Sequence, residues 1–398
     1  MTGFIGIDVA KDSFTAAFLI TNKLNIAQET ILSFSVDQNG WQSFLKTWQS
    51  LPAQNWIVGL EASGPYSQLL LRHLQTLPYP VHMLSPLQVR KFRQSQSLRK
   101  TKTDPIDAHT IALFLHHQHL QGSLKPTPPS SNLRHLVRLQ EQLTSQLVQV
   151  QNQFRQTLYL LFPELERRFA RFPKAIRRLL ACYPSAKQIA KANPDHIRTL
   201  LAQGQGSAPA ISAAELQDLA SSSLGLEDQM ASLHLKHLLS LWESIEKQHH
   251  EVSHTLQAQT RLRYPQAWQI MTQIPGLGPN LVARFLALVE DPNRFPSRKA
   301  LIAYAGLDPS VHQSGRFQAT SRLSKRGDPL LRKVLFLMAQ ALIRYTHRFH
   351  QVFQYYRQQG RRYREAVMIV ARKVLVVLYA LWTRMVPFQD TAPESASL

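Results

Sequence analysis

The sequence Lys-Thr-Asp-Pro-Ile-Asp-Ala at residues 102–108 predicts the start of a helix with two carboxylates near its first turn. Asp104 and Asp107 are three residues apart, so they share one face of that helix. One interpretation is structural: an aspartate at the N-cap, a proline at the first helical position and an acid in the first turn satisfy backbone N–H groups and complement the helix dipole. The other interpretation is a functional site.

Two isolated acids upstream favour the functional interpretation. Asp8 follows the apolar, strand-like run at residues 4–7, and Glu61 follows a similar run at residues 56–60. Acids at strand ends are site-forming positions in α/β folds. If all four acids converge, each pair of carboxylates about 4 Å apart repels by roughly 4 kcal/mol at an effective dielectric of about 20, unless cations neutralise them. Oxygen-only ligands predict Mg²⁺ or Mn²⁺.

The composition indicates a sizeable protein that binds a polyanion. The 398 residues are enough for a substantial core and for about two or three domains. The 46 Lys and Arg against 25 Asp and Glu give a net charge of +21, which favours nucleic acid without separating DNA from RNA. The single cysteine, Cys182, excludes an internal disulfide framework and suits a reducing cytosol. We expect Cys182 to be a packed small residue.

Neither a secretory signal nor a membrane span is expected. The chain begins almost at once with the strand-like run at residues 4–7, without the basic and long apolar stretches of a signal peptide. The apolar run at residues 366–386 is interrupted by Arg372, Lys373 and Arg384, which argues against a membrane span. We expect a cytoplasmic protein that is associated with the nucleoid when it is bound to DNA.

Strand-like and helix-like runs alternate in the first third of the chain and predict an α/β domain. The expected order is a hairpin or meander over residues 4–34, a helix at 36–51, strands at 56–60 and 81–84 around a helix at 66–77, and a helix at 105–117. The basic segment at residues 87–102 places cations beside the carboxylates, as a phosphate-handling site requires; a solvated helix face is the alternative.

Two long helices with narrow apolar seams are predicted after a linker at residues 122–131. One seam extends from Leu133 to Leu161 and the other from Leu235 to Leu256. They indicate either an antiparallel pair or a dimerising coiled coil, and the sequence does not choose between them. We expect His249, in the second seam, to be an interface residue rather than a ligand.

The last third of the chain has the composition of a nucleic-acid surface. It is turn-rich to Gly327 and then helical to about Val386, with dense arginines and lysines and interleaved aromatic residues. Paired glycines in a predicted turn either present backbone N–H groups to a phosphate or serve the turn alone. The residues that we assign to nucleic-acid binding are Lys102, Gly276, Gly278, Arg316, Arg322, Lys325 and Arg326.

Several of these stretches resemble the motifs of one family. Residues 6–11 (Gly-Ile-Asp-Val-Ala-Lys), 61–66 (Glu-Ala-Ser-Gly-Pro-Tyr) and 102–108 are similar, in order and spacing, to three motifs of the DEDD insertion-sequence transposases, the IS-one-ten family. The family's second domain is similar to this chain at residues 274–278, 305–309, 314–315 and 324–327. The resemblance therefore covers most of the chain.

The resemblance implies a fold for each part of the chain. It implies an α/β RNase H-like (RuvC-type) catalytic domain at residues 1–125, a long helical coiled-coil connector with a helical insertion at residues 126–262, and a mainly α-helical transposase domain at residues 263–398. We find no matching motif in residues 162–230 and assign no chemistry to them.

The resemblance also implies roles for particular residues. Position by position, Asp8, Glu61, Asp104 and Asp107 take the role of metal ligands. Ser314 takes the role of the nucleophile, although Ser-Gly by itself is ordinary turn sequence. His312 is two residues away, but we do not assign it as the base, and the group that activates the serine is left open.

The expected function is a transposase or site-specific recombinase that moves its own insertion sequence through a covalent serine–DNA intermediate. The expected partners are donor and target DNA, a guide RNA from the element, and further copies of the chain in a dimer or tetramer. One alternative is a RuvC-type Holliday-junction nuclease that hydrolyses DNA with metal-activated water. Another is a non-enzymatic nucleic-acid scaffold, against which the ordered acids in a basic chain argue.

Overall fold

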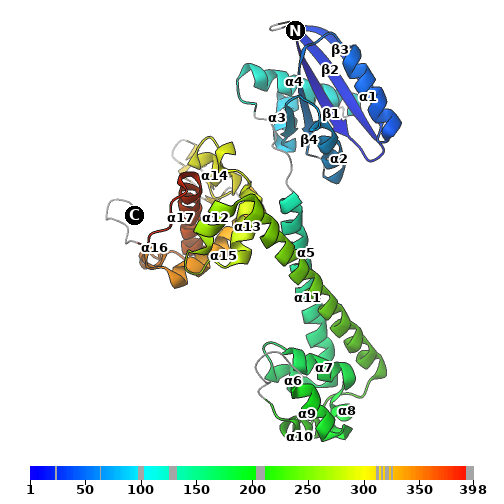
Figure 1. The fold of residues 1–398 in the computed structure, drawn as a ribbon, viewed down its shortest axis with the longest axis vertical. Coiled ribbons are helices and arrows are strands. Elements are labelled where there is room, and N and C mark those ends of the chain that lie inside the picture. Colours follow the sequence, from blue (N-terminus) through cyan, green and yellow to red (C-terminus); the bar gives the residue numbers. More distant parts are fainter. Residues whose placement is uncertain are drawn as a thin grey trace. The chain divides into compact units, whose positions relative to one another are not determined.

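The structure is a computed structural model that describes residues 1–22, 25–62, 64–96, 103–124, 132–202, 211–310, 313–314, 317–318, 322–323 and 326–390. The chain divides into two compact units, Met1–Ser130 and Ser131–Leu398. Figure 1 shows the helices and strands of each unit.

A mixed five-stranded sheet forms the centre of the first unit (Figure 1). The strand order is β3-β2-β1-β4-β5. β1 pairs antiparallel with β2, and β2 with β3, whereas β4 is parallel to both β1 and β5. The strands are β1 (Thr2–Val9), β2 (Ser13–Asn22), β3 (Asn25–Ser35), β4 (Asn55–Glu61) and β5 (Val81–Leu84). The predicted α/β character of this region is confirmed.

Helices cover both faces of this sheet because side chains alternate along each strand. α1 (Gln38–Ser50) and α2 (Pro65–Leu74) pack in one core with the odd-numbered residues of β1, such as Ile5 and Ile7. α3 (Pro86–Gln96) and α4 (Asp104–Leu120) pack in a second core that includes Phe4. The even-numbered residues of β1 therefore face α4.

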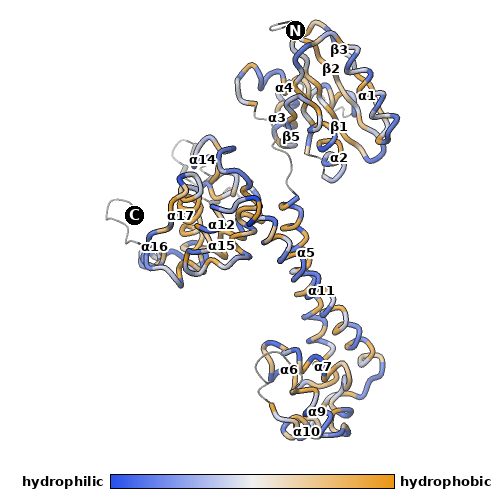
Figure 2. Tube along the Cα trace, viewed as in Figure 1, coloured by the Kyte–Doolittle hydropathy of each residue, from blue (hydrophilic) through white to orange (hydrophobic). Residues whose placement is uncertain are grey.

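Two long antiparallel helices, α5 (Asn132–Leu161) and α11 (Gln229–Arg263), run through the second unit (Figure 1). Their direction follows from the side-chain contacts between them, which pair Gln140 with Ser253, Thr144 with His249, and Thr157 with His234. In Figure 2 hydrophobic and hydrophilic residues alternate along both helices, as expected of amphipathic helices that pack on one another. The two predicted seams thus pair within one chain, with His249 at the interface.

Short helices pack around the end of the pair where α5 ends and α11 begins. Their core includes Phe154 and Trp242, whose rings meet edge to face with centroids 5.3 Å apart. Cys182 is exposed at the end of α7 (Lys174–Cys182), so its expected packing in the interior is wrong. These helices are α6 (Pro163–Arg168), α7 (Lys174–Cys182), α8 (Ala186–Lys191), α9 (Pro194–Ala202) and α10 (Ala213–Ser221).

The opposite end of the pair joins the C-terminal helical core. Orange, hydrophobic segments occur along the helices of this core in Figure 2. Within the described part of the chain, α17 is the one helix long and apolar enough to cross a membrane, but Val370, Val374 and Leu378 bury it in this core. The elements are α12 (Pro265–Thr272), α13 (Pro279–Val289), η1 (Pro292–Arg294), α14 (Arg298–Tyr304), α15 (Pro329–Tyr345), α16 (His347–Gln358) and α17 (Tyr363–Arg384).

Candidate active site

Asp8 and Glu61 lie side by side at the ends of neighbouring parallel strands. β1 and β4 are in register up to the pair Ile7 and Leu60, so Asp8 and Glu61 are the next positions on the two strands. Positions that lie opposite each other in a sheet point to the same face, on strands about 4.8 Å apart. Both residues are half-buried. The two acids therefore share the face that α4 covers.

Helix α4 approaches this face closely because the strands carry glycines beneath it. Gly6 and Gly59 are in register on β1 and β4. A Cβ atom on Gly6 would overlap the carbonyl oxygen of Ala108 and the backbone nitrogen of Ala112. Only glycine, which has no Cβ atom, permits this contact between helix backbone and strand backbone.

The direction of α4 places its first turn beside the acidic end of β1. Near the beginning of the strand, the Phe4 ring lies 5.1 Å from the ring of His116, in the last part of α4. Two residues further along the strand, Gly6 meets Ala108 in the first part of the helix. Strand β1 and helix α4 therefore run in opposite directions. Two residues beyond Gly6 the strand reaches Asp8, and the part of the helix that lies beside it is the first turn, which precedes Ala108. That turn carries Asp104 and Asp107.

The N-cap interpretation of Asp104 is wrong. Thr103 occupies the N-cap position without a side-chain cap hydrogen bond, and Asp104 is the first helical residue. The N–H of Asp107 donates to the carbonyl oxygen of Thr103 over 3.0 Å, so the backbone itself satisfies that amide. Asp104 is exposed.

The fourth acid has a cationic partner. Nη1 of Arg93, on α3, lies 2.7 Å from Oδ1 of Asp107, whose side chain is 14% exposed. A hydrogen bond between charged groups at this distance is strong and holds both side chains. The basic segment that precedes α4 therefore places one cation, Arg93, beside one of the four acids.

The four acids have the chemistry that a hard metal ion prefers, but their side chains are not arranged as a coordination group. They supply oxygen donors alone, the set that Mg²⁺ and Mn²⁺ prefer. Among the residues that the structure describes, however, no three or more His, Cys, Asp or Glu side chains form a group that could hold a metal ion. The fold thus brings Asp8, Glu61, Asp104 and Asp107 to one end of the sheet without gathering them into a finished coordination group.

Ser314 lies in a small hairpin of the second unit. β6 (Pro309–Ser310) pairs with β9 (Arg322–Leu323), and β7 (Gln313–Ser314) pairs with β8 (Phe317–Gln318). The backbone of Ser314 pairs with that of Phe317, just before the connection between the inner strands. The side chains of Ser314 and Arg322 lie outside the described part of the structure, as do the residues Lys102, His312, Arg316 and Lys325.

Two glycines meet at the base of this serine-bearing segment, which we define as residues 307–327. A Cβ atom on Gly327 would overlap the backbone nitrogen of Gly306 and the carbonyl oxygen of Tyr304. Next to this contact, the N–H of Asp328 donates to the same carbonyl over 2.8 Å. The backbone is therefore closed at the base of the segment, which explains Gly327. Gly306 has a φ of 65°, a conformation that favours glycine.

The paired glycines near residue 277 have different explanations. Gly276 has a φ of +88° in the turn between α12 and α13, a conformation that favours glycine, so turn chemistry accounts for it. Gly278 is the N-cap of α13, and a Cβ atom there would meet nothing within 4 Å. Phosphate binding at Gly276 and Gly278 stays a prediction. Arg326 is exposed, beside the base of the serine-bearing segment.

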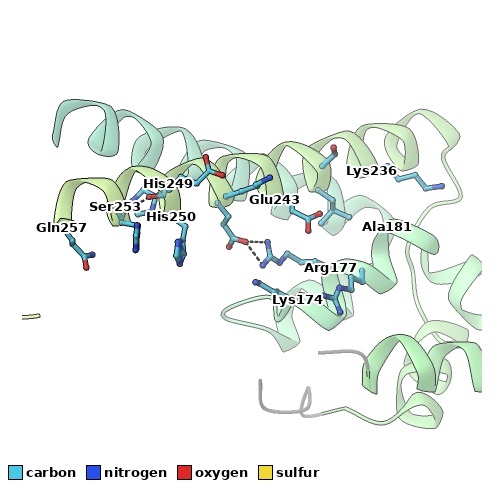
Figure 3. Close-up of a pocket in the computed structure, with 16 residues that line it drawn as sticks. Lys174, Arg177, Ala181, Lys236, Glu243, His249, His250, Ser253 and Gln257 are labelled. Atoms are coloured by element: carbon cyan, nitrogen blue, oxygen red, sulfur yellow. Dashed lines mark hydrogen bonds and ion pairs between the residues drawn. The ribbon is translucent and has the colours of Figure 1, made fainter. Parts of the chain in front are cut away.

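A groove between α7 and α11 is a feature that the sequence analysis missed. Its volume is about 1070 Å³. Figure 3 shows Arg177 at its wall, where the guanidinium donates two hydrogen bonds of 3.0 Å each to Glu246. Cations and histidines share the lining with three glutamates, so the charge selects no single ligand. These residues include Lys174, Arg178, Lys236, Lys247, His249, His250, His254, Glu243, Glu246 and Glu251.

Two family profiles match the chain. A transposase profile of the IS110 type with the DEDD motif matches residues 5–163, the part that contains all four acids. A profile described as the transposase IS116/IS110/IS902 family matches residues 268–354, which include Ser314. The two matches are in the same order as the two sets of sequence motifs.

Individual relatives match over most of the chain. The pilin gene-inverting protein of Moraxella lacunata is 24% identical over 405 residues, which cover 98% of this chain and 99% of that protein. An uncharacterized 44.8 kDa protein of insertion element IS116 from Streptomyces clavuligerus is 25% identical over 398 residues, covering 95% and 94%. A mini-circle putative transposase for IS117 from Streptomyces coelicolor is 26% identical over 347 residues, covering 83% and 82%.

Proposed function

Because the chain belongs to the IS110 family of insertion-sequence transposases, we propose that it recombines DNA through a covalent bond between Ser314 and a DNA phosphate. The acids of the first unit would hold the divalent cation that this reaction uses. The observation that carries this proposal is the meeting of Asp8, Glu61 and the first turn of α4 at one end of the sheet.

We assign the first unit to the RuvC-like, RNase H type of fold. The assignment is supported by the mixed sheet with its antiparallel meander and by the helix that covers the acidic end of β1. Four acids close together would repel one another and destabilise the protein unless a cation were bound between them. Their presence in a chain of net charge +21 favours a site that handles phosphate.

The four acids are the residues that would hold a divalent cation. Mg²⁺ or Mn²⁺ bound there would stabilise the negative charge that develops on the phosphate oxygens. Asp107 would have to exchange its Arg93 partner for this role, and the released guanidinium is suited to pair with a DNA phosphate instead. The ion pair thus keeps Asp107 neutralised until substrate arrives.

The proposed chemistry needs no external energy source. Oγ of Ser314 forms a bond to phosphorus, and the bond from phosphorus to one deoxyribose oxygen breaks. The proton lost by the serine is balanced by the proton gained by the released deoxyribose hydroxyl. Attack by another deoxyribose hydroxyl then rejoins the DNA and restores the serine. One phosphoester bond replaces another at each step.

We further propose that an RNA from the element selects the DNA sequences. We recognise no recognition-helix motif, zinc finger or basic zipper in the sequence, and phosphate contacts alone do not read sequence. The family resemblance implies such an RNA. Its base pairing would do the reading, while the many lysines and arginines hold RNA and DNA by backbone and shape. We also propose that the protein acts as a homodimer or homotetramer.

A denaturing gel tests the proposed function. The full-length protein is incubated with donor DNA, target DNA, Mg²⁺ and the transcribed RNA. We expect a covalent protein–DNA species with wild-type protein, and none with Ser314→Ala, which should still bind DNA because its phosphate contacts remain. Ser310→Ala, in the same segment, is the matched control and should behave as wild type.

The other outcomes identify the alternatives. DNA cleavage without any covalent species would indicate a nuclease that uses water. Binding without cleavage under all these conditions would indicate a scaffold. Site-specific recombination by protein freed of RNA would contradict the guide-RNA proposal alone.

A further inference from the structure

Arg134 stands in the first turn of α5, where the helix dipole opposes a cation. α5 begins at Asn132, directly after the boundary between the two compact units. The Arg134 side chain is 23% exposed. A half-buried cation at an unfavourable helix end requires partners elsewhere in the fold. Those partners come from residues more than 150 positions away in the chain.

The Arg134 guanidinium joins three elements of the C-terminal core. Nη1 lies 3.2 Å from Oδ2 of Asp328, and Nη2 donates over 2.6 Å to the carbonyl oxygen of Leu288. Nη2 also donates to the hydroxyl of Tyr304. Burial alone would lower the pKa of Arg134, but Tyr304, Asp328 and Glu290 raise it, so the guanidinium stays charged.

Glu290 adds a strained turn to this cluster. Its φ of 64° and ψ of −76°, with a hydrogen bond of 2.9 Å from the N–H of Asp291 to the carbonyl oxygen of Val289, define a rare γ-turn. Its carboxylate lies 3.9 Å from Nε of Arg134 and 3.3 Å from Nη1 of Arg294. Strained backbone persists where surrounding contacts hold it, and such places are concentrated at functional sites.

Two of the Arg134 partners flank the serine-bearing segment. Tyr304 precedes residues 307–327 and Asp328 follows them. The two are also joined directly, because the N–H of Asp328 donates to the Tyr304 carbonyl oxygen over 2.8 Å. One side chain on α5 therefore contacts both sides of the base from which Ser314 extends.

We propose that Arg134 is a positioning residue that fixes the serine-bearing segment to the start of α5. This inference rests on the proposed role of Ser314. Without the Arg134 guanidinium, Tyr304 and Asp328 lose the side chain that both contact. The Glu290 carboxylate in the strained turn then keeps only Arg294 of its two arginine partners. The base then has more than one arrangement, and the serine reaches the phosphate less often.

The chain contains a matched control on the same helix. Arg155 also pairs with a carboxylate, Glu166, at 2.6 Å, and also donates to a backbone carbonyl, that of Phe169, at 3.2 Å. It also stacks on an aromatic ring, with its guanidinium carbon 5.0 Å from the centroid of Phe172. Its side chain is 32% exposed. Arg155 lies toward the other end of α5. Its partners Phe169 and Phe172 belong to a different hydrophobic core from the one on which Tyr304 packs.

The test compares Arg134→Met with Arg155→Met in the full chain, using donor DNA, RNA and Mg²⁺. The rate of covalent adduct formation at saturating DNA should fall at least about 10-fold in Arg134→Met, because small displacements of reacting groups are costly. DNA affinity should stay within about twofold of wild type. Hydrogen exchange should become faster at residues 286–296 and 326–335. Arg155→Met should show none of these changes, even if its melting temperature falls.

A second variant keeps the test informative if Arg134→Met does not fold. Asp328 Oδ1 caps α15 by accepting from the N–H groups of Leu330 and Leu331 at 2.8 and 3.2 Å. Asp328→Asn preserves a good cap but weakens the ion pair with Arg134, so the adduct rate should fall several-fold with little loss of stability.

The outcomes separate this inference from the proposed function. A wild-type adduct rate in both Arg134→Met and Asp328→Asn overturns the positioning role. An equal loss of rate in Arg155→Met overturns it as well, because the effect would then be general destabilisation. Adduct formation by Ser314→Ala would instead contradict the proposed function, whatever Arg134 does.

Discussion

The acidic end of the first unit and the serine-bearing segment of the second are held in different ways. Asp8 and Glu61 end strands whose register fixes them, and α4 is seated against backbone at Gly6. Ser314 lies in a two-residue strand, and its segment is closed at the base by Gly306 and Gly327.

The two regions differ in how far apart in the sequence the residues that hold them are. Strand pairing and one helix determine where the acids lie, so short sequence patterns are sufficient to suggest their meeting. The base of the serine-bearing segment depends on Arg134, whose partners Leu288 and Asp328 are 154 and 194 residues away. We therefore expect the acidic end to tolerate changes at a distance and the serine-bearing segment to be sensitive to them.

The largest expected effect is a loss of recombination without a loss of the fold, which would show that the acids take part in the reaction. Asp8→Asn should reduce recombination by more than about 100-fold, because a metal ligand and its charge are lost, while the fold is retained. Asp12→Asn, an exposed neighbour in the same region, is the control. Recombination assays and thermal melts on both proteins decide the matter. Normal recombination by Asp8→Asn would remove the acidic site from the reaction.

A smaller effect tests the seating of α4. Gly6→Ala should destabilise the protein by about 1–3 kcal/mol, since the new Cβ atom would overlap helix backbone and force α4 outward. Gly59→Ala is matched in register, but the three nearest atoms to its Cβ atom belong to the Leu115 side chain and not to helix backbone, so it should cost less. Denaturant unfolding measures both. Equal destabilisation would mean that the Gly6 contact has no special role in placing the acids.

The ion pair between Arg93 and Asp107 predicts a change in metal requirement. Arg93→Gln removes the cation that now occupies Asp107, so half-maximal adduct formation should need about two- to fivefold less Mg²⁺. Arg90→Gln, exposed on the same helix, should leave the Mg²⁺ titration unchanged. A higher Mg²⁺ requirement in Arg93→Gln would instead make Arg93 a supporter of the metal-bound arrangement.

The smallest effect concerns the helix pair that carries neither set of catalytic residues. Burial lowers the pKa of His249 below its ordinary value of 6.5, and Arg284 and His250 lower it further. The unfolded chain therefore binds a proton more readily, so this residue's contribution to stability is present above pH 6.5 and is lost as the pH falls toward the folded-state pKa.

The corresponding measurement is a series of thermal melts. Between about pH 7.5 and 5.5, wild type should lose more stability than His249→Gln, which keeps a polar group near Thr144 but does not titrate. His254→Gln, exposed on the same helix, should follow wild type. Identical pH dependence in all three proteins would show that burial of His249 has no linkage to folding.

Much of the fold follows from periodicity in the sequence. Alternating and continuous apolar runs mark the strands of the first unit, and three- and four-residue spacings mark α5 and α11. The sequence did not choose between an antiparallel pair and a dimerising coiled coil. An apolar seam indicates that one face of a helix is buried, but it does not identify the helix that packs on that face. The contacts of Thr144 with His249 and of Gln140 with Ser253 make that choice.

The acids of the candidate site could be predicted from the sequence, but the residue that we propose to position the serine-bearing segment could not. Acids at strand ends stand out in the sequence, whereas Arg134 is one of many basic residues until its distant partners are known. Its position in a first turn, against the helix dipole, is the one local signal that could have singled it out. The N-cap assignment of Asp104 failed because the preceding threonine takes that position in the structure.

The most direct test of the account is to identify the residue that is joined to DNA. The covalent protein–DNA species formed with Mg²⁺ is digested with nuclease and protease, and the peptide that retains a nucleotide phosphate is sequenced by mass spectrometry. We predict a single modified residue, Ser314, and no modified peptide from Asp8→Asn protein. A phosphate on any other residue, or efficient recombination without a covalent species, would contradict it.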